Sequence, residues 1–297
     1  MKRLKIIIVI LTLLEPSLVH ALSIVYSFRI TQITRQPIVP ETENKPSSTS
    51  LLWFNYFQKT RCFGIRENYT GGLATYIRNF RKQYFFRADF AVGKAHQTIK
   101  KIETSNVIEP DDFLFTVGKN IMKTDCGRVS VAGLIGIPTH SVFTLQRVGF
   151  GNGQPGIGAQ IDGLYNLSDK IDVLGGVRYN YFIPRTAFNN QDEKYTFTVG
   201  SIADFLIGLQ TSNNIGHGIE GGYAARWGFG AKATPRIIVL EDASYMRNNF
   251  YLVYKYTFLT EKVAHRLLLN ISYGFDSKPK DLGYNAVMVF ASWGIAF

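Results

Sequence analysis

The residues best placed to do chemistry in this chain are charged side chains that alternate with apolar ones along extended segments. In the segment 83–93, Arg87 and Asp89 lie on the face opposite Phe86 and Phe90. The same reading of every segment gives the set Arg87, Asp89, Asp112, Asp162, Asp172, Arg178, Asp204, Glu220, Arg226, Lys255 and Arg266. Because five of these are basic and six acidic, they could neutralise one another as ion pairs that fill an interior. Alternatively, they could line a small polar pore that discriminates little between anions and cations.

Motifs for cofactor or metal chemistry are weak. Residues 151–156 match the letters G-x-G-x-x-G, but Pro155 interrupts them and an alternating strand follows, whereas nucleotide binding requires a helix there. Beyond the N-terminal apolar segment, the histidines are not spaced as paired metal ligands; they are His96, His140, His217 and His265. We therefore predict no catalytic residue, no cofactor and no metal site.

Two features could belong to an enzyme at the rim of a barrel. His140 and Ser141 are adjacent, so on a strand they would point to opposite faces and could not act together as a lipase pair. Asp111 and Asp112 form an acidic pair without a matched histidine, and a solvated loop end explains them more simply. A rim lipase or protease is the least favoured of the functions considered.

Period-two alternation of apolar and polar residues predicts twelve strands. They lie at 49–57, 71–80, 83–93, 112–119, 128–137, 155–166, 169–183, 194–209, 217–229, 248–259, 264–275 and 285–297. The segment 194–209 alternates most clearly, with Phe205, Ile207 and Leu209 opposite Asp204 and Gly208. Half-apolar strands of this kind suit a sheet with lipid on one side and polar groups on the other.

The predicted connections alternate in length along the chain. Those after even-numbered strands are mostly short and centre on 81–82, 166–168, 210–216 and 260–262, whereas those after odd-numbered strands are mostly longer. Transmembrane barrels have short periplasmic turns and long outer loops. The turn expected at 119–127, which contains Cys126, is longer than this pattern suggests.

The strand count has two open alternatives. Residues 23–31 also alternate and would make thirteen strands, whereas a strand near 95–103 would make fourteen. An even count places both ends of the barrel on the same side. We expect an all-β, transmembrane, antiparallel up-and-down barrel of about twelve strands, with fourteen as the alternative.

The C-terminal segment carries a specific pattern. Val287, Val289, Ala291, Trp293, Ile295 and Phe297 form one apolar row, and the sequence ends on this row. A last strand of this kind can pair with the first strand and so close a barrel. The ending resembles the C-terminal signal of outer-membrane barrels that is read by the assembly machinery. The resemblance assigns that role to Trp293, Ile295 and Phe297.

The N-terminal segment predicts export. A basic stretch at 1–5 precedes an apolar run at 6–14, and small residues at 19–21 suit a cleavage site. We expect a signal peptide at 1–21, with a short anchor helix as the alternative. Residues 22–48 then form a periplasmic segment and linker, and 49–297 form the barrel.

Composition narrows the class of protein further. The chain has 297 residues, a formal charge of +11 and 14% aromatic residues, and its mean hydropathy is close to zero. The apolar run at 6–14 is far shorter than the roughly 20 residues of a spanning helix, and no other apolar stretch approaches that length. Basic residues do not cluster, so we expect no nucleic-acid partner, and their excess suits anionic lipid headgroups. Cys62 and Cys126 could form a disulfide in an oxidising compartment, but the expected topology puts them at opposite ends of the barrel.

As a whole, the chain resembles outer-membrane β-barrels of Gram-negative-type bacteria, at the level of the class. The resemblance implies residence in the outer membrane and contact with lipid and with the barrel assembly machinery. The expected function is a passive or weakly selective channel for small hydrophilic solutes. The alternative is a structural or adhesion barrel that acts through its outer loops. The alternative fold is a soluble periplasmic β-sandwich, whose last strand would be an aggregation-prone edge.

Overall fold

The computed structural model describes fourteen ranges of the chain. They are 47–60, 66–80, 83–99, 102–105, 109–110, 112–139, 155–188, 194–198, 200–211, 216–229, 232–234, 245–260, 263–278 and 284–296. The signal peptide expected at 1–21 and the possible strand at 23–31 lie outside these ranges, as does most of the linker expected at 22–48.

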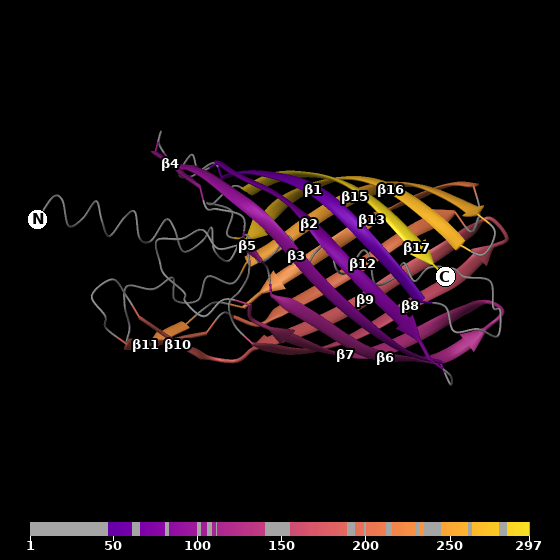
Figure 1. The fold of residues 1–297 in the computed structure, drawn as a ribbon, viewed down its shortest axis with the longest axis horizontal. Helices are drawn as coiled ribbons and strands as arrows, with labels where there is room; N and C mark the ends of the chain where they lie inside the picture. The colour runs from indigo at the N-terminus through magenta and orange to yellow at the C-terminus, as the bar shows by residue number, and fades with distance from the viewer. Residues whose placement is uncertain are drawn as a thin grey trace, which may run out of the picture.

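The described residues are almost entirely β-strand (Figure 1). The long strands are β1 Ser47–Thr60, β2 Arg66–Asn79, β3 Tyr84–Ile99, β6 Phe113–Thr124, β7 Gly127–Ile137, β8 Gly156–Ser168, β9 Ile171–Phe182, β12 Ile202–Thr211, β13 Gly216–Gly228, β15 Tyr245–Thr260, β16 Val263–Lys278 and β17 Tyr284–Ala296. The short strands are β4 Ile102–Ser105, β5 Glu109–Pro110, β10 Arg185–Phe188, β11 Lys194–Thr198 and β14 Lys232–Thr234.

The long strands close into an antiparallel ring. Each pairs with the next long strand in the sequence, from β1–β2 and β2–β3 through β3–β6 to β16–β17. β17 pairs in turn with β1, with Ser48 opposite Ala296 and Thr60 opposite Tyr284. The fourteen-stranded sheet therefore comprises a ring of twelve strands, with β4 and β5 appended to β3. This confirms the expected up-and-down barrel of about twelve strands, closed between its first and last strands.

The sequence prediction was wrong in two places, and a third region decides an alternative that it had left open. The expected strand 194–209 is divided: β11 pairs with β10 and β14 in a separate three-stranded sheet, and only β12 joins the ring. The long turn expected at 119–127 is a tight turn at Asp125 and Cys126, because β6 continues to Thr124 through a bulge. The region 95–103 forms no additional ring strand, because it continues β3 and pairs it with β4.

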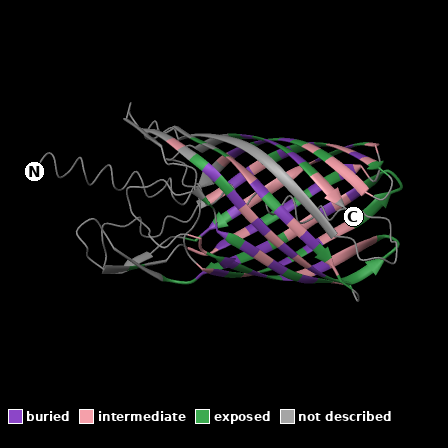
Figure 2. Cartoon of the chain, viewed as in Figure 1, coloured by how far each residue is buried: buried purple, intermediate pink, exposed green. Residues whose placement is uncertain are grey.

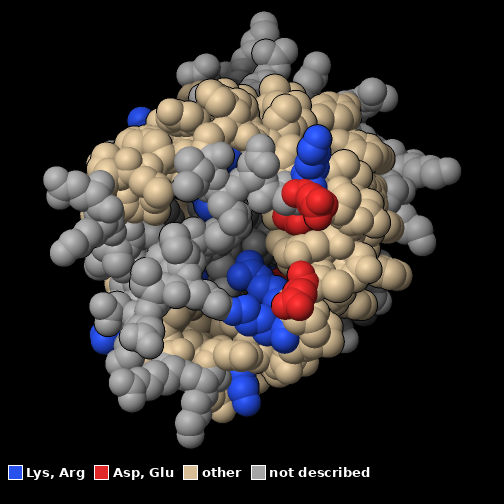
Figure 3. All heavy atoms as spheres, turned by 90° about the vertical axis from the view of Figure 1, so that its right-hand side faces the viewer, with Lys and Arg blue, Asp and Glu red and all other residues tan. Residues whose placement is uncertain are grey.

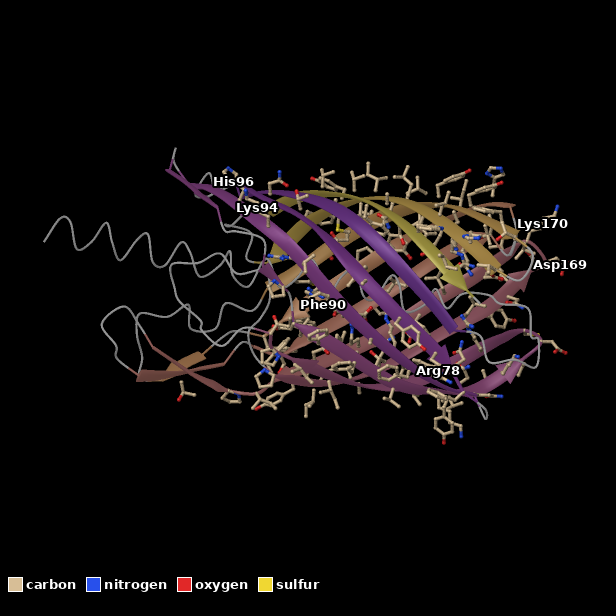
Figure 4. The ribbon with its side chains drawn as sticks, viewed as in Figure 1. Arg78, Phe90, Lys94, His96, Asp169 and Lys170 are labelled. Atoms are coloured by element: carbon tan, nitrogen blue, oxygen red, sulfur yellow. The ribbon has the colours of Figure 1, made fainter. Side chains whose placement is uncertain are left out.

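The two ends of the barrel differ, as the connection lengths predicted. At one end, short turns join β6 to β7, β8 to β9 and β15 to β16. Arg78, Asp169 and Lys170 lie at this end, which we call the short-turn end, whereas Lys94 and His96 lie at the opposite, loop end (Figure 4). The sheet of β10 and β11 projects beyond the ring at the loop end (Figure 1).

Burial alternates residue by residue along the strands (Figure 2). On β12, Ile202, Asp204 and Leu206 are buried, whereas Phe205 and Ile207 are 43% and 47% exposed. On β17, the apolar-row residues Val287, Val289 and Trp293 are likewise exposed, and the alternating residues Met288, Phe290 and Ser292 are buried. Since a barrel strand points successive side chains in and out, the buried set faces the interior.

The outer face is apolar and banded. Aromatic residues lie near both ends of the strands: Phe80, Tyr84, Tyr165 and Trp293 toward the short-turn end, and Phe113, Tyr181, Trp227 and Phe250 toward the loop end. Exposed aliphatic residues lie between them: Ile161, Val177, Ile207, Leu252 and Leu269. Two aromatic girdles that flank an aliphatic band are the outer surface expected of a membrane barrel. In the described part of the chain, no helix has the length and apolar character to cross a membrane.

Interior glycines make room for large neighbouring side chains. A Cβ atom on Gly118 would overlap the ring of Phe85, and one on Gly176 would lie 2.7 Å from the Asp162 carboxylate. Glycines on the outer face are less constrained, and a Cβ on Gly133 would meet no heavy atom within 4 Å. The interior is therefore packed by pairing small residues with large ones, as small barrels require.

Candidate functional site: charged rows in the barrel interior

The structure places the charged residues singled out in the sequence on the interior face. Nine are buried: Arg87, Asp89, Asp112, Asp162, Asp172, Arg178, Asp204, Glu220 and Arg226. Lys255 and Arg266 are intermediate. Charged side chains on the lipid face would each cost up to about 2–4 kcal/mol at mid-depth. Whether the inward set lines a conducting lumen stays a prediction.

The first group, which we call the arginine row, crosses five neighbouring strands. In register from β8 to β15, it consists of Gln160, Arg178, Asp204, Arg226 and Arg247. Arg226 donates to both Asp204 oxygens, from Nε at 2.6 Å and from Nη2 at 3.1 Å. Arg178 Nε lies 3.7 Å from Asp204 Oδ2. One carboxylate thus bridges two guanidinium groups, and all three side chains are at most 2% exposed.

The second group lies nearer the short-turn end and connects two carboxylates through Lys255. In this group, which we call the acid row, Gln210 lies in register between Asp172 and Glu220. Gln210 donates to Asp172 at 3.0 Å. Lys255 Nζ donates to the Gln210 carbonyl at 2.5 Å and lies 3.0 Å from Glu220 Oε2. The chain of contacts fixes the orientation of the amide and satisfies both of its ends.

An apolar layer separates the two rows along the wall. It consists of Leu174, Leu206, Tyr251 and Val253, with Ala224 and Leu268 packed against it. Along β12, Leu206 and Gly208 lie between Asp204 and Gln210; along β9, Leu174 and Gly176 lie between Asp172 and Arg178. The wall therefore changes from basic to apolar to acidic between the loop end and the short-turn end.

A third group lies across the ring on β2 and β3. Arg87 donates to Asp89 from Nε at 3.0 and 2.8 Å and from Nη2 at 2.8 Å, and Thr75 Oγ1 donates to the same carboxylate at 2.6 Å. Gln160 makes a similar contact, from its amide to Asp162. These buried charges have charge-assisted hydrogen-bond partners, which offset the cost of removing them from water.

The interior opens at the short-turn end into a polar mouth. Basic and acidic side chains lie beside a hollow near the centre of this face (Figure 3). A pocket of about 480 Å³ lies between the turns, lined among others by Lys123, Asp125, Cys126, Arg128 and Asp169. Cys126 is exposed, whereas Cys62 lies outside the described residues, so whether the two pair stays open.

Sequence reasoning missed two inward arginines. Arg247 is 2% exposed and precedes the predicted strand 248–259 by one residue, so a longer strand would have included it. Arg128 lies on the same face as Ser130 and Ala132, and counting by twos from either residue would have found it. With these two, the described inward set has seven basic and six acidic residues, and its charges remain nearly balanced.

The described histidines are dispersed over the barrel. His217 contacts Tyr254 and Tyr256 on the outer face, and His265 stacks on Phe258 with ring centroids 4.8 Å apart. His96 lies at the loop end, and His140 is outside the described residues. Within the described ranges, no group of His, Cys, Asp or Glu residues is arranged to hold a metal.

The predicted assembly-signal residues lie on the outer row of β17. Trp293 is 40% exposed and stacks near His265, at a centroid distance of 6.1 Å. Ile295 is intermediate in exposure, and Phe297 lies outside the described residues. Their recognition by assembly machinery stays a prediction.

Comparison with known proteins supports the fold. No family model matches this chain, and no curated protein matches it by sequence. An outer membrane channel from Pseudomonas putida F1 matches with a TM-score of 0.70 at 10% identity, covering 89% of this chain and all of the channel. The translocator domain of the autotransporter NalP from Neisseria meningitidis matches with a TM-score of 0.54 at 11% identity, over 95% of this chain and 97% of that domain. In fold, the chain is therefore similar to bacterial outer-membrane β-barrel proteins.

Proposed function

We propose that this protein is an outer-membrane channel for small hydrophilic solutes. The observation that carries the proposal is the inward face, which places charged and amide side chains of both signs inside a closed barrel with an apolar exterior. A polar interior of this kind provides hydrogen-bonding groups to a solute along the barrel axis. The likeness to an outer membrane channel is consistent with this role.

The near balance of inward charges makes the proposed channel weakly selective. Seven basic and six acidic side chains leave little net potential to favour one sign of ion. We expect K⁺ and Cl⁻ permeabilities within about twofold of each other. The measurement is the reversal potential of refolded protein in a planar bilayer under a KCl gradient. An absence of conductance steps in correctly folded protein would overturn the channel function.

Localisation and partners belong to the same proposal. We propose that residues 1–21 direct export and that the C-terminal residues Trp293, Ile295 and Phe297 are read by the assembly machinery. Two basic residues lie over rings of the aromatic girdle near the short-turn end: Arg78 over Phe80 at 5.6 Å and Lys119 over Tyr84 at 5.2 Å. This position at the edge of the apolar band suits contact with anionic headgroups. Fractionation should recover the mature chain with the outer membrane. Recovery in the soluble periplasm would contradict both the localisation and the channel.

A second candidate function is a surface barrel that binds a partner through its loop end. The observation that favours it is the sheet of β10, β11 and β14, which projects beyond the ring, together with the extension of β3 that pairs with β4. Replacing residues 185–198 with a short Gly-Ser linker distinguishes the two functions. The channel predicts unchanged solute flux, whereas the surface barrel predicts lost partner binding.

We propose no enzymatic role for the described residues. His217 and His265 face outward into an aromatic belt, and neither is hydrogen-bonded to a serine, cysteine or carboxylate that could act as a nucleophile or orienting group. Assays with phospholipid and peptide substrates test this directly, and turnover that is lost on replacement of a barrel residue would contradict it.

A further inference from the structure

The apolar layer lies between the two charged rows of the wall, and its members are shielded from solvent. Leu206 and Val253 are 0% exposed, Leu174 is 1% and Tyr251 is 6%. They face the interior, so lipid does not explain their apolar character. Leu206 lies two residues from Asp204, and Val253 lies two residues from Lys255. A solute moving along this wall would therefore leave one charged row, cross the layer and reach the other.

Tyr251 is held in this layer by two glycines. Gly208, Gly222 and Tyr251 lie in register across β12, β13 and β15. A Cβ atom on Gly208 would lie 2.5 Å from the Tyr251 hydroxyl oxygen, and one on Gly222 would lie 2.7 Å from it. Since real Cβ contacts are not this short, only glycine at both positions lets the ring lie across the wall. Leu174 lies beside Gly208 on the next strand and completes the surface.

From this geometry we propose that the apolar layer is the permeability barrier of the interior, and that Tyr251 is the residue that determines its size. The inference rests on the proposed channel function and names its selective element. An apolar constriction offers no hydrogen bonds to replace those of water, so it opposes hydrated ions more strongly than neutral solutes. The layer therefore favours compact, uncharged and partly apolar solutes over small ions.

The test measures unitary conductance for wild type and two layer variants, Tyr251→Ser and Leu206→Asn. Leu206→Asn introduces a polar group into the layer, whereas Tyr251→Ser removes the ring and keeps a hydroxyl. We expect each to raise conductance at least about twofold, because a wetted constriction conducts better than a dewetted one. Tyr251→Phe keeps the ring and should conduct like wild type. Tyr179→Ser makes the same chemical change on the outer face of β9, where Tyr179 is 47% exposed, and should also have no effect.

Heat-modifiable migration in gels identifies the variants that have folded. If one of the two layer variants fails to fold, the other still tests the inference. A conducting wild type, with a higher unitary conductance in both Tyr251→Ser and Leu206→Asn, would support the barrier. A conducting wild type matched by both folded layer variants would overturn the inference and leave the channel function intact. Silence of wild type and of both folded layer variants would overturn the channel function together with the inference. Liposome swelling with glycerol and with potassium salts then tests the expected preference for neutral solutes.

Discussion

Asp204 is the residue whose replacement should most affect stability. Its carboxylate accepts two hydrogen bonds from Arg226 and lies 3.7 Å from Arg178, and the three side chains are 1–2% exposed. The change Asp204→Asn keeps the shape of the side chain and removes its charge. Two buried guanidinium groups then lose the carboxylate between them.

The size of the effect follows from burial. Removing one partner of a buried ion pair costs about 3–5 kcal/mol, because the remaining charge stays desolvated. Replacing an exposed carboxylate should change the free energy of unfolding by no more than about 0.5 kcal/mol. Asp169 in the β8–β9 turn is exposed, so Asp169→Asn provides this control. We therefore expect Asp204→Asn to lower the free energy of unfolding by about 3–5 kcal/mol and Asp169→Asn to leave it unchanged.

The assay is urea unfolding of refolded protein in lipid vesicles, followed by tryptophan fluorescence. The second change Arg226→Gln tests the cause: if both single changes break one interaction, the double variant should lose less than the sum of the two. A loss below about 1 kcal/mol for Asp204→Asn, or strict additivity in the cycle, would refute the view that this carboxylate neutralises the arginine row.

Three further changes test other parts of the fold. Gly222→Ala should destabilise the barrel by about 1–3 kcal/mol in the same unfolding assay, because its Cβ would overlap the backbone carbonyl oxygen of Ile207 and lie 2.7 Å from the Tyr251 hydroxyl. Gly133→Ala should cost little, since no heavy atom lies within 4 Å of its Cβ, and equal effects of the two changes would count against the packing argument. Leu269→Arg on the outer face should lower the free energy of unfolding by about 2–4 kcal/mol, and Ile121→Arg near the short-turn end by about 0–1 kcal/mol. The two native side chains are similarly exposed, at 54% and 57%, so depth in the membrane accounts for the difference. A larger loss for Ile121→Arg than for Leu269→Arg would contradict this placement of the membrane. Deletion of Phe297 should reduce the amount of folded barrel in outer-membrane fractions of cells. An unchanged amount would contradict the role of Phe297 as an assembly signal.

Period-two alternation predicted the ring well, because one face of each strand must tolerate hydrocarbon and the other must not. Asp204 and Phe205 were placed on opposite faces from the sequence, and the structure buries the first and exposes the second. The pattern failed where alternation continued beyond the ring. Tyr195 and Phe197 extend the row of β12, yet they belong to β11, whose partners are β10 and β14. Which strand pairs with which is a long-range property that local periodicity does not contain.

The bulge in β6 shows a second physical limit. Between Asn120 and Met122 the register shifts, so period-two counting from either side gives the wrong face for the other. The strand therefore looked finished at Lys119, although it continues to Thr124. The apolar layer was hidden for a related reason. Its members come from β9, β12 and β15, and only the register of the folded barrel brings Leu174, Leu206 and Tyr251 together.

The sequence allowed two interpretations of the inward charges, which could fill the interior or line a pore. The contacts favour the filling role for the two charged rows. Asp204 is held by two arginines, and Lys255 is held by Glu220 and Gln210, so both charged rows are engaged in packing the wall. Permeation should then depend more on the uncharged layer between the rows than on the rows themselves. If this division is correct, Asp204→Asn changes the free energy of unfolding with little change in the conductance of molecules that fold, whereas Tyr251→Ser changes conductance. A barrel whose charged rows controlled both properties would show the two effects together in each variant.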